Sequence, residues 1–242
     1  MKMVRSVVWV VVFVFLVAAV GCGGDTPTDT SENKAPAQQG ESQEKPAEEV
    51  ASSKNTPLPK DAKEVTVSGD VYHYTIDPCA IASAEEVETF LGKPFTTKFS
   101  FVYGIPPYTR CEYAVELPEE ERAGRSPDTL AVSVVEPLTL AEAGFPGLDT
   151  AAEAFNRHKK ALNNAGAEIE EVPDLGDDAF VQSSDGVLHL LAGDVYLRVS
   201  ASIYTNETAP TLDELHRKLA DNNAKVAKRF AAELLLPNLN GS

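Results

Sequence analysis

A hairpin of two strands near the carboxyl end constrains the fold more than any other feature of the sequence. The stretch VLHLLAGDVYLRVSASI (187–203) holds two apolar-rich runs around Gly193-Asp194, a two-residue turn typical of antiparallel hairpins. With this turn one face becomes wholly aliphatic, since Ala192, Leu190 and Leu188 pair with Val195, Leu197 and Val199. The other, more polar face carries His189, Tyr196, Arg198 and Ser200, with His189 directly across from Arg198.

Further strands and three helices complete the expected fold. Strands are expected at 65–76, as a hairpin about Gly69-Asp70, and at 98–117, 129–136 and 178–183. Capping-box pairs predict three helix starts, at Ser83 with Glu86, Thr150 with Glu153 and Thr211 with Glu214. The last helix has an apolar stripe of Leu212, Leu215, Leu219, Val226, Phe230 and Leu234, interrupted by Asn222 and Asn223, where looser or bent packing is expected. Hairpins with separate helices predict an α+β fold, an antiparallel sheet packed by about three helices.

The amino-terminal segment has the features of an export signal. Lys2 and Arg5 precede an almost wholly apolar run from Val7 to Val20, which is shorter than the ~20 residues of a membrane-spanning helix. The sequence Ala19-Val20-Gly21-Cys22 resembles the bacterial lipobox. That resemblance implies cleavage after residue 21 and a diacylglycerol on Cys22, usually with an amide-linked acyl chain, an anchor strong enough to hold a protein at a membrane. An incidental cysteine behind an ordinary secretory signal, or an uncleaved anchor, is the alternative.

The chain then divides into a tether and a domain. Residues 22–63 are rich in Pro, Ser, Thr, Gln, Glu and Lys and contain almost no large apolar residue, so they cannot bury a core and are expected to be disordered. Residues 64–242 are expected to form one extracytoplasmic α+β domain. Gly23 rather than Asp follows the cysteine, which favours the periplasmic side of an outer membrane if the cell has two membranes.

Charge excludes some classes of partner. The formal net charge is −16, and removal of the signal would make it more negative. Such a surface argues against nucleic-acid binding, which needs Lys and Arg to neutralise phosphates. It also argues against direct adsorption to anionic lipid. Membrane association is therefore expected only through the lipid on Cys22.

The remaining cysteines form an even pair. Cys79 and Cys111 are the two left once Cys22 carries the lipid, and in an exported protein such a pair indicates one disulfide. The closed loop would contribute about 3.7 kcal/mol in the chain-entropy description. Two free buried thiols are the alternative.

Several segments together resemble a known lipoprotein family. DPCAIASAEEVETFLG followed by RCEYAV, then VPDLGDDAF and a strand hairpin, is similar to the lipoproteins called domain of unknown function 3558, and to other sensor-type lipoproteins. The likeness covers residues 77 to about 235 and rests on short structural motifs. It implies an envelope location and a bridge between Cys79 and Cys111, and it brings no catalytic residues.

The sequence offers few groups for chemistry. His73, His158, His189 and His216 do not fall at metal-ligand spacing, so structural or solvated roles are expected. Asp174, Asp177 and Asp178 could supply oxygens to calcium, but a turn into a strand accounts for them more simply. No nucleophile elbow or glycine-rich phosphate loop appears. We therefore expect no metal, no cofactor and no catalytic residues.

The stretch FVYGIPPYT (101–109) is the candidate partner contact. Phe99 and Phe101 are expected in the core, because they share the inward strand face. Ile105, Pro106, Pro107 and Tyr108 would then form a stiff apolar tip, since proline restricts the backbone and lowers the cost of ordering on binding. The alternative is a tip that folds back over a helix and is buried.

Three functions are compatible with the sequence. The favoured one is a lipid-anchored, non-catalytic binding or interaction domain of the bacterial cell envelope, whose partner is an envelope protein or a small ligand. A carrier or sensor of a small apolar ligand would instead need a cavity between sheet and helices. An envelope hydrolase, the least favoured, would need a nucleophile and a base that meet only in the folded chain.

Overall fold

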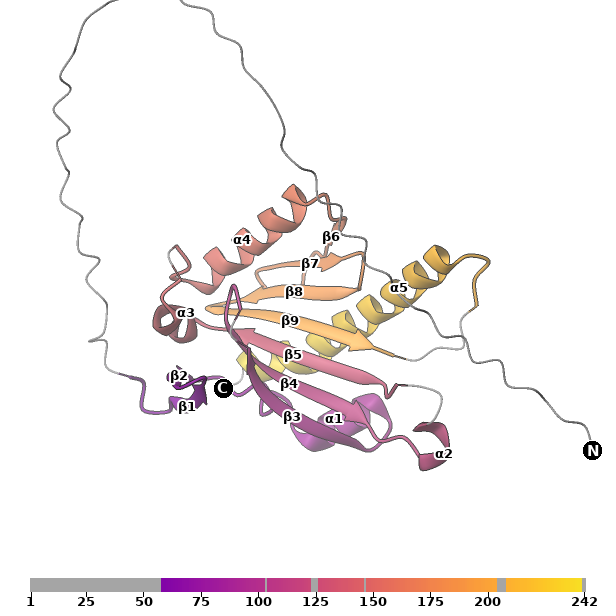
Figure 1. Ribbon diagram of the computed structural model, residues 1–242, viewed down its shortest axis with the longest axis horizontal. Coiled ribbons are helices and arrows are strands. Elements are labelled where there is room, and N and C mark those ends of the chain that lie inside the picture. The colour runs from indigo at the N-terminus through magenta and orange to yellow at the C-terminus, as the bar shows by residue number, and fades with distance from the viewer. Residues whose placement is uncertain (1–57, 103, 123–125, 146, 204–207, 241–242) are drawn as a thin grey trace, which may run out of the picture. The chain divides into compact units, whose positions relative to one another are not determined.

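A seven-stranded antiparallel sheet is the centre of the fold (Figure 1). The computed structural model describes residues 58–102, 104–122, 126–145, 147–203 and 208–240, without the side chains of residues 121, 122 and 240. The strands are β1 (Lys63–Val67), β2 (Asp70–Tyr74), β3 (Phe95–Val102), β4 (Tyr108–Val115), β5 (Thr129–Val135), β6 (Ile169–Glu171), β7 (Asp178–Gln182), β8 (Val187–Ala192) and β9 (Val195–Ser202). The helices are α1 (Ala84–Leu91), α2 (Glu119–Arg122), α3 (Pro137–Ala143), α4 (Ala151–Asn164), α5 (Leu212–Phe230), the π-helical turn η1 (Ala231–Leu235) and α6 (Leu236–Asn240).

The sheet consists of two meanders that meet side by side. Its order is β3-β4-β5-β9-β8-β7-β6, so the pairing of β5 with β9 joins the first three strands to the last four. Strands β1 and β2 form a separate hairpin. The predicted α+β class with an antiparallel sheet and one disulfide is confirmed.

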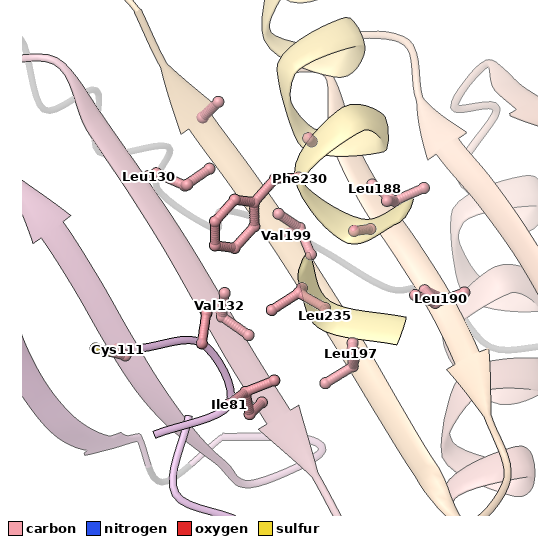
Figure 2. Packing of buried hydrophobic residues seen from close by; sticks show 14 of the residues in the cluster. Ile81, Cys111, Leu130, Val132, Leu188, Leu190, Leu197, Val199, Phe230 and Leu235 are labelled. Carbon is pink, nitrogen blue, oxygen red and sulfur yellow. The ribbon is translucent and has the colours of Figure 1, made fainter. Parts of the chain in front are cut away.

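The register of the β8–β9 hairpin is the one predicted. Ala192 pairs with Val195, Leu190 with Leu197 and Leu188 with Val199, while His189 lies opposite Arg198. The aliphatic face packs against α1, α5 and η1, and Figure 2 shows Phe230 and Leu235 over Leu197 and Val199. This face therefore forms the larger hydrophobic core.

The opposite face of the same strands is also largely buried, which corrects the expected polar face. Helices α3 and α4 cover it and form a second core around Phe155, Phe180 and Tyr196. His189 and Tyr196 are both 0% exposed. A turn fixes which residues share a face, but the number of helical layers depends on contacts distant in sequence.

Capping places the three predicted helices correctly. Ser83 with Glu86 and Thr150 with Glu153 form complete capping boxes. At α5 the described contacts show one half of the box, the bond from the Glu214 N–H to Thr211 Oγ1. Helix α1 ends at Gly92 in the left-handed conformation, as expected for a glycine stop.

The buried face of α5 differs from the predicted stripe of large residues. Its buried residues are Ala220, Ala224, Ala227 and Phe230, whereas Leu212 is 65% exposed. The helix needs small residues there because the β7–β8 turn comes against it at Gly186. Asn223, where looser or bent packing was expected, instead accepts a hydrogen bond from the Ile203 N–H at the end of β9 (3.2 Å), within one continuous helix.

The first hairpin turns one residue earlier than predicted. Val67 pairs with Asp70, so the loop is Ser68-Gly69 rather than Gly69-Asp70. Both loop residues have positive φ, 54° and 95°, as a type I′ turn requires. Asp70 is therefore the first residue of β2.

Candidate functional site

The predicted lipid attachment residue, Cys22, lies outside the described residues, as do the predicted signal and most of the predicted tether. Within the part of the chain that is described, none of the helices has both the length and the apolar character needed to cross a membrane.

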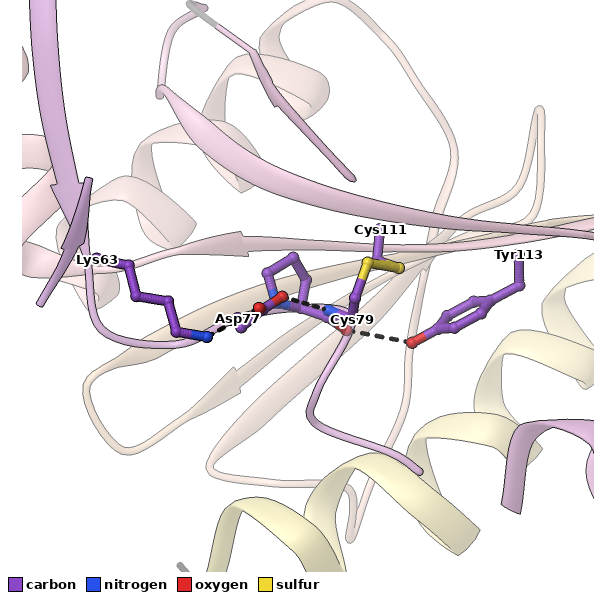
Figure 3. The surroundings of a disulfide bond; sticks show 6 residues. Lys63, Asp77, Cys79, Cys111 and Tyr113 are labelled. Carbon is purple, nitrogen blue, oxygen red and sulfur yellow. Dashed lines mark hydrogen bonds and ion pairs between the residues drawn. A yellow bond between two sulfur atoms is a disulfide. The ribbon is translucent and has the colours of Figure 1, made fainter. Parts of the chain in front are cut away.

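The disulfide joins the segment before α1 to strand β4. Cys79 and Cys111 are bonded, with their Cα atoms 5.1 Å apart, and Figure 3 shows their surroundings. Asp77 accepts a hydrogen bond from the Cys79 N–H at 2.9 Å and pairs with Lys63 at 2.9 Å. Tyr113 donates its hydroxyl to the Pro78 carbonyl at 3.2 Å, and burial raises the pKa of Tyr113 to about 12. These contacts hold a turn in place, so the role of the bridge here is structural.

The candidate contact loop has both exposed and buried members. Ile105 is 71% exposed, Pro106 and Pro107 are buried, and Tyr108 is half-buried. The prolines anchor the loop to the fold while Ile105 projects from it. The loop therefore matches neither a fully exposed tip nor a fully buried one.

Phe99 and Phe101 are not core residues, contrary to the prediction. Phe99 is 36% exposed and stacks on Tyr74, and Phe101, which is half-buried, stacks on Tyr72. They do share a strand face with Cys111, which is opposite Phe99. Strand β3 is one of the two edge strands of the sheet, and this end of the face meets the separate β1–β2 hairpin instead of the main core.

A buried aromatic and polar cluster lies between α4 and strands β7, β8 and β9. The ring of His189 stacks on Phe180 (centroids 4.5 Å apart) and on His158 of α4 (4.8 Å). His189 Nδ1 is 2.7 Å from the hydroxyl of Tyr196. Sequence reasoning placed His189 and Arg198 together but not His158, because the helix contact brings distant residues side by side.

Burial keeps the titratable groups of this cluster neutral. Burial lowers the pKa of His189 to about 2, and the nearby Arg198 contributes to that lowering. Burial and Arg198 also lower the pKa of His158. Burial raises the pKa of Tyr196, so its hydroxyl keeps its proton. Arg198 is therefore the charge that acts on both imidazoles.

Arg198 links this cluster to the candidate contact loop. Its guanidinium carbon lies 5.5 Å from the centre of the Tyr108 ring, a cation–π contact. Within the described residues, two buried side-chain polar atoms have no hydrogen-bond partner, Arg198 Nε and His189 Nε2. They belong to residues directly opposite each other on β9 and β8.

Other predicted polar groups have structural contacts. Asp177 accepts a hydrogen bond from the Gly193 N–H at 2.7 Å, and Asp178 pairs with Lys159 at 3.3 Å. His73 pairs with Glu142 of α3 at 2.6 Å. Among the described residues, no group of three His, Cys, Asp or Glu side chains is arranged to hold a metal ion.

An open pocket beside the Gly193-Asp194 turn is large enough for a small ligand. It has a volume of about 680 Å³ and lies between the Gly193-Asp194 turn, residues 75–81, Asp61, Lys63 and the end of α6. Its walls combine apolar side chains such as Ile81 and Val195 with Asp61, Asp77 and Asp194. The lining is thus of mixed polarity.

Comparisons with protein-family models, curated proteins and solved structures found no match to this chain.

Proposed function

We propose that this protein is a lipid-anchored, non-catalytic interaction domain of the bacterial cell envelope, on the extracytoplasmic side, and on the periplasmic side of the outer membrane if the cell has two membranes. The lipobox ending at Cys22, the polar tether and the resemblance to the family called domain of unknown function 3558 support that location. The exposure of Ile105, at 71%, is the observation that carries the interaction role. It places an apolar side chain in solvent on a loop whose two prolines are buried.

The buried prolines lower the free-energy cost of binding at this loop. Ordering a flexible loop on association costs free energy, and a loop already held by buried prolines avoids much of that cost. Ile105 then offers apolar area, and the half-buried Tyr108 offers an aromatic ring of the kind enriched at contact hot spots. The loop connects β3 to β4 of the seven-stranded sheet.

Two experiments test the two halves of this proposal. Cys22→Ala should leave an unprocessed precursor that no longer incorporates labelled fatty acid, and continued labelling would contradict an anchor at Cys22.

A photo-crosslinking amino acid at position 105 should capture one envelope component in intact cells. The same group at Leu212, an equally apolar and exposed residue on α5, is the matched control. Equal capture from both positions would contradict a specific contact at the loop.

The 680 Å³ pocket favours a second candidate function, the binding of a small ligand. Its size is within the usual range for ligand sites, although such sites are mostly apolar. Val195→Trp would fill part of the pocket. Loss of binding of an apolar fluorescent probe in this variant, with unchanged crosslinking at 105, would assign the function to the pocket instead.

A further inference from the structure

Arg198 has unusual surroundings for a cation in so acidic a protein. Several other cations pair with carboxylates, among them Lys63 with Asp77, Arg110 with Glu112, and Lys159 with Glu171. Within the described residues no carboxylate pairs with Arg198, although the residue is half-buried. Its Nε is enclosed without an acceptor, a condition that is rare for a buried polar atom and needs an explanation.

The groups described around Arg198 do not neutralise its charge. Tyr108 contacts it through its ring face, and His158 and His189 are imidazoles kept neutral by burial. His189 Nε2 is also enclosed without a partner. When Tyr196 donates its hydroxyl proton to Nδ1, Nε2 carries the ring proton. Two donors on facing positions of β8 and β9 then both lack an acceptor.

Short side chains lie next to Arg198 on strands β5 and β9. Arg110 of β4, Ser133 of β5 and Arg198 of β9 occupy opposed positions on three neighbouring strands. Ala131 and Ser200 are the next opposed pair on the same face. In Figure 1, α1 and α5 lie behind these strands, and no described helix passes in front of the middle of β4 and β5. Ala131 and Ser133 are buried, whereas Arg110, Arg198 and Ser200 are half-buried, so part of the Arg198 side chain faces solvent on this side of the sheet.

We propose that Arg198 binds a carboxylate group of a ligand on the sheet face formed by β4, β5 and β9. A guanidinium offers a planar fork of donors that matches the two oxygens of a carboxylate. The local charge is a single positive one, since Arg110 is already paired with Glu112 at 3.1 Å. A monoanion balances that charge, whereas a phosphate dianion would not. This inference rests on the proposed function in one respect, because the Tyr108 contact places the carboxylate next to the Ile105 loop.

The test follows binding at Arg198 directly. Nuclear magnetic resonance of arginine-labelled, full-length protein reports the Nε–Hε signal of each arginine during titration with sodium benzoate. A short peptide with a free terminal carboxylate, and the same peptide amidated, distinguish a small free acid from a polypeptide end. We expect a saturable shift of the Arg198 signal with benzoate or the free-acid peptide, and no such shift with the amide.

Variants then test whether Arg198 itself binds the carboxylate. Arg198→Gln should weaken carboxylate binding at least tenfold. Arg198→Lys keeps the charge but loses the planar fork of donors, so its affinity for carboxylate should lie between those of Arg198→Gln and the parent protein. Arg217→Gln, which removes an exposed arginine from α5, is the matched control and should bind as the parent protein does. The wild-type titration needs no variant, so it remains decisive if Arg198→Gln fails to fold.

Three outcomes would overturn the inference: no saturable shift at Arg198, equal binding by Arg198→Gln, or tighter binding of inorganic phosphate than of benzoate. Crosslinking from position 105 tests the proposed function separately. Retained crosslinking without carboxylate binding would reject the Arg198 site alone. Carboxylate binding without crosslinking would reject the loop contact alone.

Discussion

Gly186 lies directly against Ala220 of α5, with no room for a side chain. A Cβ at Gly186 would come 2.2 Å from the Ala220 carbonyl oxygen and 2.9 Å from the Ala224 backbone nitrogen. Gly186 also has a φ of +73°, which side chains of L-residues rarely adopt. The β7–β8 turn and the alanine face of α5 thus determine each other's position.

Gly186→Ala should therefore destabilise the protein strongly. We expect a loss of roughly 2–5 kcal/mol in the free energy of unfolding, from overpacking against helix backbone and from the left-handed backbone conformation. Chemical denaturation measures it. Gly193→Ala is the matched control, because Gly193 has a φ of +56° and nothing within 4 Å of a Cβ. That variant should lose only about 1–2 kcal/mol in the free energy of unfolding. Equal losses in the two variants would show that the close contact with α5 does not contribute to the cost of Gly186→Ala.

The buried His189 should make the protein sensitive to acid. Its pKa is about 2 in the folded state against an ordinary 6.5. Between those values the unfolded chain binds one proton more than the folded one, so stability is full above pH 6.5 and falls as the pH falls. The slope from one group is at most about 1.4 kcal/mol per pH unit.

His189→Gln tests this directly, because glutamine keeps a polar group near the Tyr196 hydroxyl but does not titrate. Unfolding free energies measured from pH 7.5 to pH 4 should fall less steeply in the variant than in the parent protein. Burial of His158 adds a second contribution of the same sign, so some slope should remain. An unchanged slope would mean that His189 is not kept neutral by burial.

The sequence predicted those features whose causes are local. The register of β8 and β9 follows from a two-residue turn and alternating side chains. The starts of α1, α4 and α5 follow from Ser or Thr capping residues. The pairing of Cys79 with Cys111 followed from counting the cysteines.

Most of the features that were missed depend on contacts distant in sequence, and strand β6 and helix α3 were missed for other reasons. Strand β6 has three residues, too few to show an alternating pattern. Helix α3 starts at Pro137 directly after β5 and was missed, although the Pro137 start and the Gly144 stop are typical helix signals. The second core under α4, the small-residue face of α5 and the exposure of Phe99 all depend on which elements pack together.

In the candidate site, too, the features with local causes were predicted and those that depend on distant contacts were not. The predicted register placed Arg198 opposite His189, but the stacking of His158 and the contact with Tyr108 depend on α4 and β4. Glu142 binds His73 of β2 and Glu136 binds Thr75 just after β2, and neither contact gave a signal in the sequence because the partners are more than 60 residues earlier.

Reduction of the disulfide should destabilise the protein without changing its fold class. The bridge spans 32 residues in sequence, so its loss should cost up to about 3.7 kcal/mol by the chain-entropy description. Thermal or chemical unfolding with and without a reductant measures the difference. Tyr113→Phe is a useful comparison, since it removes only the hydrogen bond to the Pro78 carbonyl, for a cost of about 1 kcal/mol. Two thiols that can be alkylated before reduction would contradict the bridge.

Glu136 should anchor the chain that follows β2. The residue is 3% exposed, and its carboxylate accepts hydrogen bonds from the Thr75 N–H and hydroxyl, both at 2.6 Å, and from the Ile76 N–H at 3.3 Å. Glu136→Ala would leave these donors without an acceptor. Amide hydrogen exchange should therefore accelerate at Thr75 and Ile76 and along β2. Glu64→Ala, at an exposed position of β1, should leave exchange there unchanged.

The pH dependence of Glu136 has the opposite sign to that of His189. Burial raises the pKa of Glu136 above its ordinary 4.5, and the bonds from Thr75 and Ile76 reduce that rise. Its contribution is thus full below pH 4.5 and declines as the pH rises through the folded-state pKa. Glu136→Gln is neutral at every pH, so the free-energy cost of this substitution should shrink as the pH rises from 4 to 8. A cost that grows over that range would mean that the hydrogen bonds to the carboxylate outweigh its burial.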